Sequence, residues 1–145
     1  NILCEDSETN ANSVQPTEIF LTNRNFDRFS GDIILYKCST LTTFEMSDGS
    51  PYNLTGKIEI TQNDALESVY IYQLEEIIGF FDLSANPVLE RVYFGQLLGV
   101  SQFIKIVDNG GSSPNGGIES LDLNQLVRVG ENGPETFYFD SISDA

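Results

Sequence analysis

The sequence contains no histidine and no tryptophan, and only 2 Cys, 1 Met and 7 Lys and Arg among its 145 residues. Histidine is the commonest general base near neutral pH and the commonest metal ligand in proteins. Its absence excludes Ser-His-Asp and Cys-His catalytic sites and the ordinary zinc and haem sites. Two cysteines are too few for a zinc site built from cysteine alone. We therefore expect a protein that is not an enzyme and has no resident cofactor.

Cations are scarce, because the 7 Lys and Arg face 22 Asp and Glu and leave a net charge of −15. Such a chain repels nucleic-acid phosphates and anionic lipid headgroups, and no basic patch offsets this. We expect no nucleic-acid partner. The favoured explanation of the negative charge is solubility, or life in a salty or calcium-bearing medium. The alternative explanation is a specific cationic partner. No apolar run approaches the roughly 18 residues of a membrane helix, so we expect no membrane insertion.

The start of the chain and its cysteines both favour export. The first residue is Asn1 rather than Met, as in a chain whose leader was removed, although a trimmed chain would look the same. We expect a secreted, extracellular or cell-surface protein. Cys4 and Cys38 predict a disulfide, within one chain or between two, that closes a loop of about 35 residues and contributes roughly 3–4 kcal/mol. Two free thiols are the alternative. Asn53 begins an Asn-Leu-Thr pattern and is a possible glycosylation site.

The chain divides into a polar N-terminal arm, residues 1–17, and a single domain over residues 18–145. The domain has enough apolar residues for a core, with 10 Phe and 6 Tyr in a chain that is 40% hydrophobic. Short segments rich in β-branched and aromatic residues predict strands. They are 18–22, 32–38, 41–46, 56–61, 68–74, 77–83, 91–98, 102–107, 121–129 and 136–142.

Turn signals separate these segments every 8–14 residues, and apolar and polar residues alternate cleanly over 57–61. One face of the sheet is therefore expected to be wet. This pattern predicts an all-β fold, an antiparallel β-sandwich of the Ig-like or jelly-roll-like kind, with an extended N-terminal arm. We find no internal repeat. At most two short helices are expected, one opened by Asn86 and Pro87 and one by Asn63.

Two sets of side chains could form a carbohydrate site. Paired carboxylates catalyse glycoside hydrolysis, and the candidates here are Glu75, Glu76, Asp82 and Glu90. A position on a solvated sheet face is the favoured interpretation of these four residues. Aromatic rings could instead form a platform on which sugars stack, and a role in the core is favoured over that platform. The rings are those of Tyr70, Tyr72, Phe80, Phe81, Tyr93 and Phe94.

Calcium is the metal that the composition allows, because it accepts carboxylate and carbonyl oxygens in loose geometry. The glycine-rich segment 108–117 and its flank supply oxygen ligands in Asp108, Asn109, Asn115 and Glu119. Asp48 and Asn53 form a weaker candidate. The spacing matches no EF-hand loop. A flexible loop without metal is the favoured interpretation.

The predicted function is a non-catalytic structural or adhesive protein outside the cell, most specifically a subunit of a surface filament or pilus-type assembly. Ile19, Phe20 and Leu21 lie in a short β-former behind the polar arm and could add to a sheet edge of another copy. The same residues could instead be the molecule's own first strand. The alternative function is a monomeric secreted module that binds carbohydrate or calcium. A glycosidase-like enzyme comes third. Exposed aromatic patches favour the module, and an arm that leaves the domain favours the filament.

Overall fold

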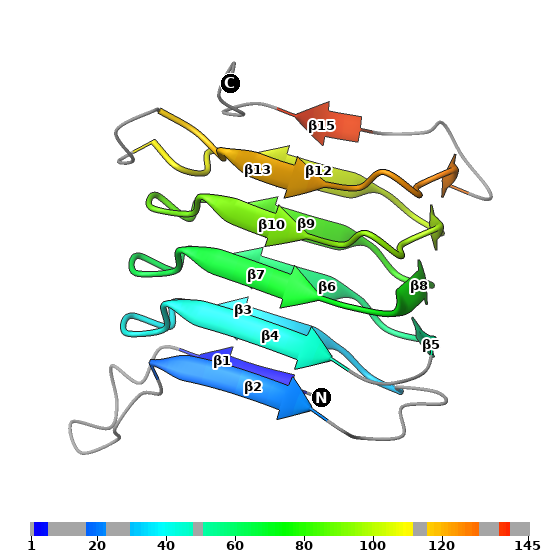
Figure 1. Cartoon of the computed structure of the whole chain (residues 1–145), viewed down its shortest axis with the longest axis horizontal. Helices are drawn as coiled ribbons and strands as arrows, with labels where there is room; N and C mark the ends of the chain where they lie inside the picture. Colours follow the sequence, from blue (N-terminus) through cyan, green and yellow to red (C-terminus); the bar gives the residue numbers. More distant parts are fainter. Residues whose placement is uncertain are drawn as a thin grey trace.

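The fold is a parallel β-solenoid of about 4 turns, seen in a computed structural model (Figure 1). The structure describes residues 2–5, 17–22, 30–47, 51–111, 116–130 and 137–139, with the backbone alone at 2–5, 22 and 137–139. Strands make up all the regular structure in these residues, and no helix is present in them. Consequently, the described part of the chain has no helix long and apolar enough to span a membrane.

The strands form three sheets, and every strand pair in them is parallel. Sheet A contains, in spatial order, β1 (Ile2–Glu5), β3 (Ile33–Tyr36), β6 (Ile58–Thr61), β9 (Phe81–Ser84), β12 (Ile104–Val107) and β15 (Phe137–Phe139). Sheet B contains β13 (Ser120–Asp122), β10 (Arg91–Tyr93), β7 (Ser68–Ile71), β4 (Thr43–Ser47) and β2 (Glu18–Thr22). Sheet C contains β14 (Arg128–Val129), β11 (Gly99–Val100), β8 (Leu74–Ile77) and β5 (Tyr52–Leu54).

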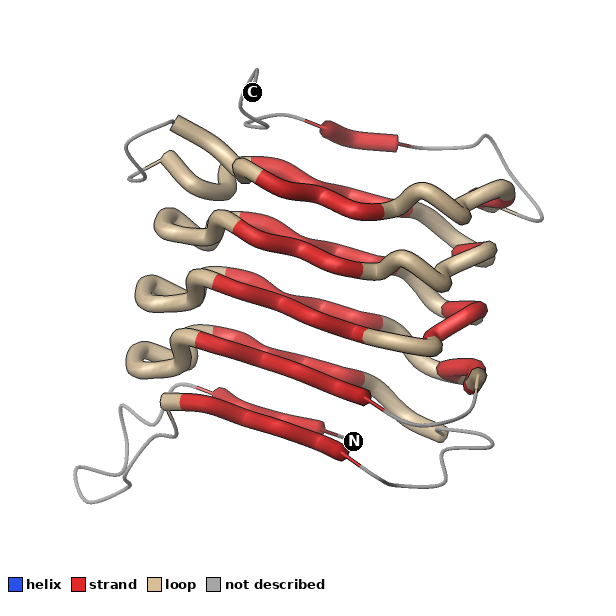
Figure 2. The backbone as a smooth tube through the Cα atoms, in the orientation of Figure 1, coloured by secondary structure: helices blue, strands red, loops and turns tan. Residues whose placement is uncertain are grey.

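Each turn of the solenoid runs through sheet A, then sheet B, then sheet C, and the next turn stacks on the one before. In Figure 1, sheet B lies in front of sheet A, and the short strands of sheet C lie along the right side. Figure 2 shows the loops that lead from sheet A to sheet B stacked one above another on the left. Residues 33, 58, 81 and 104 are register partners in sheet A, so successive turns are 25, 23 and 23 residues long.

A repeated set of inward positions builds the core. In the three turns that begin at β3, β6 and β9, six positions are at most 2% exposed, at offsets 0, 2, 5, 8, 11 and 13 from the first residue of the sheet A strand. In three turns they are Ile33, Leu35, Cys38, Leu41, Phe44 and Met46; Ile58, Ile60, Asn63, Leu66, Val69 and Ile71; and Phe81, Leu83, Asn86, Leu89, Val92 and Phe94. Each buried apolar side chain stabilises the fold by about 1.5–3 kcal/mol. Since no turn can bury its own inward face, stacking creates the core.

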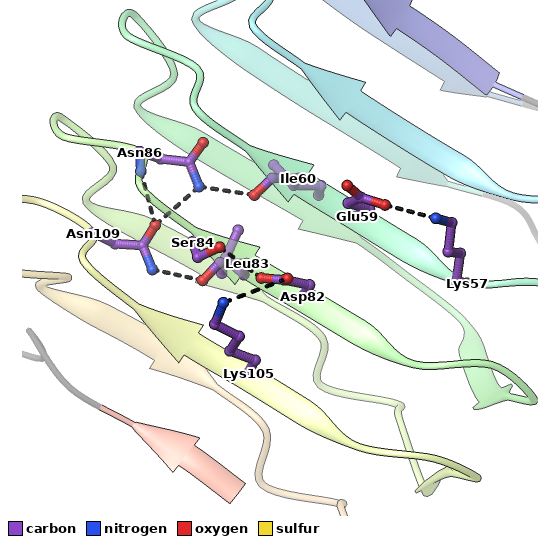
Figure 3. A network of polar contacts seen from close by, with 9 residues as sticks. All are labelled: Lys57, Glu59, Ile60, Asp82, Leu83, Ser84, Asn86, Lys105 and Asn109. Carbon is purple, nitrogen blue, oxygen red and sulfur yellow. Dashed lines mark hydrogen bonds and ion pairs between the residues drawn. The ribbon is translucent and has the colours of Figure 1, made fainter.

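The corner between sheets A and B contains a ladder of buried asparagines, Asn63, Asn86 and Asn109, part of which is drawn in Figure 3. The Oδ1 atom of Asn86 accepts from the backbone N and the Nδ2 of Asn63, at 3.1 and 3.0 Å. The Nδ2 of Asn86 donates to Ile60 O and to Asn109 Oδ1, at 3.0 and 2.9 Å. Every amide therefore links two turns and satisfies polar groups inside the core.

The prediction of an antiparallel β-sandwich, Ig-like or jelly-roll-like, is wrong, although the all-β class is confirmed for the described residues. In-and-out alternation is the same in a solenoid strand and in a sandwich strand. The two folds differ in whether the chain reverses at each turn or bends and continues in one sense. At the A–B corners the bend uses a left-handed residue, with φ between 51° and 58°, at Lys37, Gln62, Ala85 and Asp108. None of these residues is glycine, which is the residue that usually marks a left-handed backbone conformation in a sequence. The corners therefore could not be recognised from residue types alone.

Three smaller expectations also fail. The predicted helices at Asn86 and Asn63 are absent, because both side chains bind across turns instead of capping a helix, and residues 91–93 form β10. The extended arm is wrong at residues 2–5, which form β1 and pair with β3. The chain also has an internal repeat. Its signal is an asparagine with a leucine three residues later, in Asn63 with Leu66 and in Asn86 with Leu89.

Candidate functional site

The outer face of sheet B carries a row of five side chains, one from each strand. The register aligns Phe20 with Glu45, Glu45 with Tyr70, Tyr70 with Tyr93, and Tyr93 with Asp122. Phe20 is 52% exposed, and the other four are partly exposed. Their sequence neighbours on the strands, such as Val69 and Val92, point into the core, which fixes these five outward.

Tyr72 follows β7 and completes an aromatic cluster with two members of this row. The Tyr72 ring centroid lies 5.0 Å from that of Tyr93 and 6.2 Å from that of Tyr70. The Tyr70 and Tyr72 rings are nearly parallel, with 7° between their planes. We call Tyr70, Tyr72 and Tyr93 with the flanking Glu45 and Asp122 the tyrosine face. Its rings are adjacent and each is partly open to solvent.

A glycine gives the Tyr93 ring its place in the cluster. Gly95 lies one 23-residue turn after Tyr72 and therefore occupies the matching position of the next turn. A Cβ atom at Gly95 would lie 2.5 Å from the Tyr93 hydroxyl and 2.6 Å from the ring carbon that bears it. Because real Cβ atoms do not come this close, any other residue at position 95 would require the Tyr93 ring to shift from its present place beside Tyr72.

The charged groups of this surface are mostly acidic. Glu18 and Glu45 lie outward on β2 and β4, and Asp122 lies on β13. Arg91 on β10 is the one cation among the outward residues of the described sheet B strands, and it pairs with Glu90 at 3.4 Å. No Lys or Arg of the described residues forms an ion pair with Glu45 or Asp122.

Burial raises the pKa of the Tyr72 hydroxyl above its ordinary value of 10.0, and the carboxylate of Glu45 acts in the same direction. The neighbouring hydroxyls of Tyr70 and Tyr93 add to the shift. Tyr72 therefore stays protonated at neutral pH. Its O–H is available as a hydrogen-bond donor beside an anionic acceptor.

The six aromatic residues of the predicted platform separate in the structure. Tyr70, Tyr72 and Tyr93 meet on the outer face of sheet B, whereas Phe81 and Phe94 are buried and pack with their ring centroids 4.7 Å apart. Phe80 lies on another side of the solenoid and stacks on Phe103 at 4.8 Å. The core role favoured from the sequence thus holds for Phe81 and Phe94 but not for the tyrosines.

The four carboxylates considered for hydrolysis lie on different elements. Glu75 and Glu76 are on β8 of sheet C, Asp82 is on β9 of sheet A, and Glu90 precedes β10 of sheet B. Three of them have cationic partners: Glu76 pairs with Arg128, Asp82 with Lys105 and Glu90 with Arg91. The structure does not bring these four acids together at one point.

One of the calcium candidates, Asn109, belongs to the buried asparagine ladder. Asn109 is fully buried, and its Oδ1 accepts from Asn86 while its Nδ2 donates to Leu83 O at 2.8 Å. That oxygen is therefore used inside the fold. Asn115 and Asp48 lie outside the described residues. Among those described, Asp108 and Glu119 included, no three acidic or cysteine side chains gather where they could hold a metal ion.

Cys38 occupies the asparagine-ladder position of its turn, is fully buried and takes part in a disulfide. The side chain of Cys4 lies outside the described residues, and its backbone in β1 lies beside Leu35 of β3. The Cys4–Cys38 pairing stays a prediction that intact mass with and without reductant can test. Asn53 is exposed on β5, so its amide is open to solvent as a glycosylation site requires.

The segment proposed for strand addition belongs to its own domain. β2 pairs with β4 along its whole length, and Ile19 and Leu21 pack against the core while Phe20 points outward. Reasoning from the sequence also missed Glu45 and Asp122. A 23-residue repeat would have aligned Tyr93 with Tyr70, but Glu45 and Asp122 lie 25 and 29 residues from their register partners, so that spacing does not point to them.

No family model, curated protein or solved structure matches this chain.

Proposed function

We propose that the protein is a non-catalytic carbohydrate-binding module whose ligand lies on the tyrosine face of sheet B. The observation that carries this proposal is the cluster of three partly exposed tyrosine rings beside two carboxylates, Glu45 and Asp122. Exposed aromatic rings that the core does not require favour a binding role. Here the residues inward of the tyrosines already fill the core.

Sugars match this surface chemically. One side of a sugar ring presents C–H groups, which gain free energy when they leave water against an aromatic ring. The hydroxyls at its rim need hydrogen-bond partners. Carboxylates accept such bonds and tyrosine hydroxyls both donate and accept them. Strands spaced about 4.8 Å apart hold these groups on a rigid sheet, which lowers the entropy cost of binding.

The filament hypothesis loses the argument on which it was based. It required Ile19, Phe20 and Leu21 to leave the domain and pair with a neighbour, and β2 instead pairs with β4. An exposed aromatic patch is the feature that distinguishes a binding module from a filament subunit. The patch therefore favours the module.

Affinity electrophoresis through gels containing soluble neutral polysaccharides, followed by calorimetry with short oligosaccharides, tests the proposal. We expect at least one polysaccharide to retard the protein. The variant Tyr72→Ala/Tyr93→Ala should weaken binding by at least about tenfold, which corresponds to 1.4 kcal/mol.

Tyr36→Ala is the matched control, because Tyr36 is a partly exposed tyrosine on the outer face of sheet A. It should leave binding unchanged. Retardation by none of the polysaccharides, or equal loss in the sheet A control and the sheet B variant, would contradict the proposal. Thermal unfolding of each variant shows whether the solenoid is intact.

A further inference from the structure

We infer that the carbohydrate bound by the tyrosine face carries protonated amino groups, which presumes that the face binds carbohydrate as proposed above. The central row of sheet B has a regular order: Glu45, Tyr70, Tyr93 and Asp122 lie on four successive strands. A carboxylate therefore stands at each end of the tyrosine pair. Three strand spacings separate the two acids, or roughly 14 Å along the sheet.

Neither carboxylate is neutralised within the described part of the protein. The ion pairs of the described residues join Lys57 to Glu59, Arg91 to Glu90, Lys105 to Asp82 and Arg128 to Glu76. Four of the five cations in the described ranges are thus already paired. The fifth, Lys37, lies 5.4 Å from the ring centroid of Tyr36, on β3 of sheet A.

The rings between the two acids also favour a cation. The face of an aromatic ring carries negative electrostatic potential, so an ammonium group near it is attracted by the ring as well as by a carboxylate. Tyr72 strengthens this arrangement, because its ring adjoins those of Tyr70 and Tyr93. An acidic sugar would meet repulsion from Glu18, Glu45 and Asp122 and from a chain of net charge −15.

The shape of the surface selects a sugar over a peptide side chain as the carrier of the charge. The three rings form a row rather than a closed cage, since Tyr72 stacks on Tyr70 with 7° between their planes and meets Tyr93 on its other side at 42°. A chain of linked amino sugars would lay C–H faces on the rings and place an ammonium group near each carboxylate. A single lysine side chain would reach only one of the two acids.

Three trisaccharides of similar size test the inference by calorimetry near pH 6: a glucosamine trimer, its N-acetylated form and a galacturonic acid trimer. We expect the amino form to bind about three- to tenfold more tightly than the acetylated form at about 10 mM salt, since each exposed pair of an ammonium and a carboxylate adds a modest attraction. The uronic acid should bind most weakly. The preference for the amine should disappear at about 1 M salt, where charges are screened within a few ångströms.

The variant Glu45→Gln/Asp122→Asn tests whether these two carboxylates cause the preference for the amino trimer. It should bind the amino and acetylated trimers with equal affinity. Glu59→Gln/Asp82→Asn on sheet A is the matched control, because it changes the net charge equally on the other face. This control should retain the preference.

The outcomes separate the two ideas. If the wild type binds the neutral and amino trimers equally, carbohydrate binding stands and the preference for an amine is wrong. If both double variants lose the preference equally, net charge causes it, and the role of Glu45 and Asp122 is wrong. If no trimer and no polysaccharide binds, the proposed function itself fails, and this inference fails with it.

Discussion

The outer faces of sheets A and B follow the same alternation but use their polar groups differently. On sheet A, the aligned row contains Glu59, Asp82 and Lys105, and each of these groups has a charged partner on the same face, which for Glu59 is Lys57 at 2.7 Å (Figure 3). Lys105 pairs with Asp82 at 3.9 Å, and the Ser84 hydroxyl donates to Asp82 at 2.7 Å. On sheet B, the corresponding row places two tyrosines between two acids that form no ion pair with any described residue.

The aromatic rings differ in the same way. Phe80 at the start of the sheet A strand is covered by the Lys57 ammonium, 5.0 Å from its ring centroid, and by Phe103. Among the rings of the described residues, the three tyrosines of sheet B contact one another, and they remain partly open to solvent. One scaffold thus carries a face whose groups stabilise the protein and a face whose groups are available to a ligand. Substitutions on the outer face of sheet A should therefore change stability, and those on the outer face of sheet B should change binding.

The largest expected effect comes from the ladder that supports both faces. Asn86→Ala removes the acceptor of two hydrogen bonds from Asn63, so the Asn63 backbone N loses its partner, and it removes the Nδ2 donor to Ile60 O and Asn109 Oδ1. Asn109 Oδ1 still accepts from the backbone N of residue 86 at 3.2 Å. Each unsatisfied buried group costs about 1–3 kcal/mol, so the free energy of unfolding should fall by about 3 kcal/mol or more. Denaturant unfolding measures this loss.

Asn53→Ala on the exposed side of β5 is the control for the ladder variant and should change stability by less than about 0.5 kcal/mol. A loss below about 1 kcal/mol in Asn86→Ala would show that the ladder is not a principal support of the solenoid.

The second effect alters sheet B without removing any aromatic ring. Gly95→Ala places a methyl group where the Tyr93 ring lies, so the ring must turn away from Tyr72. Carbohydrate affinity should fall by about threefold or more, and the near-ultraviolet dichroism of the tyrosines should change. Gly111→Ala is the control, because a Cβ atom there meets nothing within 4 Å. Unchanged affinity in Gly95→Ala would mean that the position of Tyr93 does not matter for binding.

The third effect is confined to sheet A and concerns stability alone. A double-mutant cycle of Asp82→Asn and Lys105→Met should give a coupling energy of about 0.2–1 kcal/mol, as expected for a partly exposed ion pair. Carbohydrate affinity should be the same in all four proteins of the cycle. An affinity that follows the sheet A pair would remove the contrast between the two faces.

The smallest effect is the pH dependence of Tyr72. Its pKa is raised in the folded state, so the folded protein holds this proton more tightly than the unfolded chain does. The resulting stability is fully present below the ordinary pKa of 10.0 and is lost as the pH rises through the folded-state pKa. Tyr72→Phe should therefore show a flatter fall in stability above pH 10 and should lose one tyrosinate absorbance step above that value. An identical titration in both proteins would contradict the shift.

The sequence predicted most of the strands but not the sense in which they pair; it missed β1, β5 and β11 and joined β13 and β14 into one segment. The alternation in residues 57–61 specifies a strand with one buried face, and β6 has that structure. It is equally compatible with an antiparallel partner, since side chains alternate in both kinds of sheet. Parallel pairing follows from a long-range match, Ile58 beside Phe81 and Phe81 beside Ile104, which local patterns do not contain.

The candidate site shows the same division. From the sequence alone, Tyr70 and Tyr72 share one face of a strand, and their polar hydroxyls make them better suited to a surface than the phenylalanines. Only the tertiary structure brings Tyr93, 21 residues after Tyr72, to a centroid distance of 5.0 Å from it and places Glu45 and Asp122 at the ends of the row. The physical reason is that alternation is a property of one strand, whereas the row exists only after the solenoid stacks its turns in register.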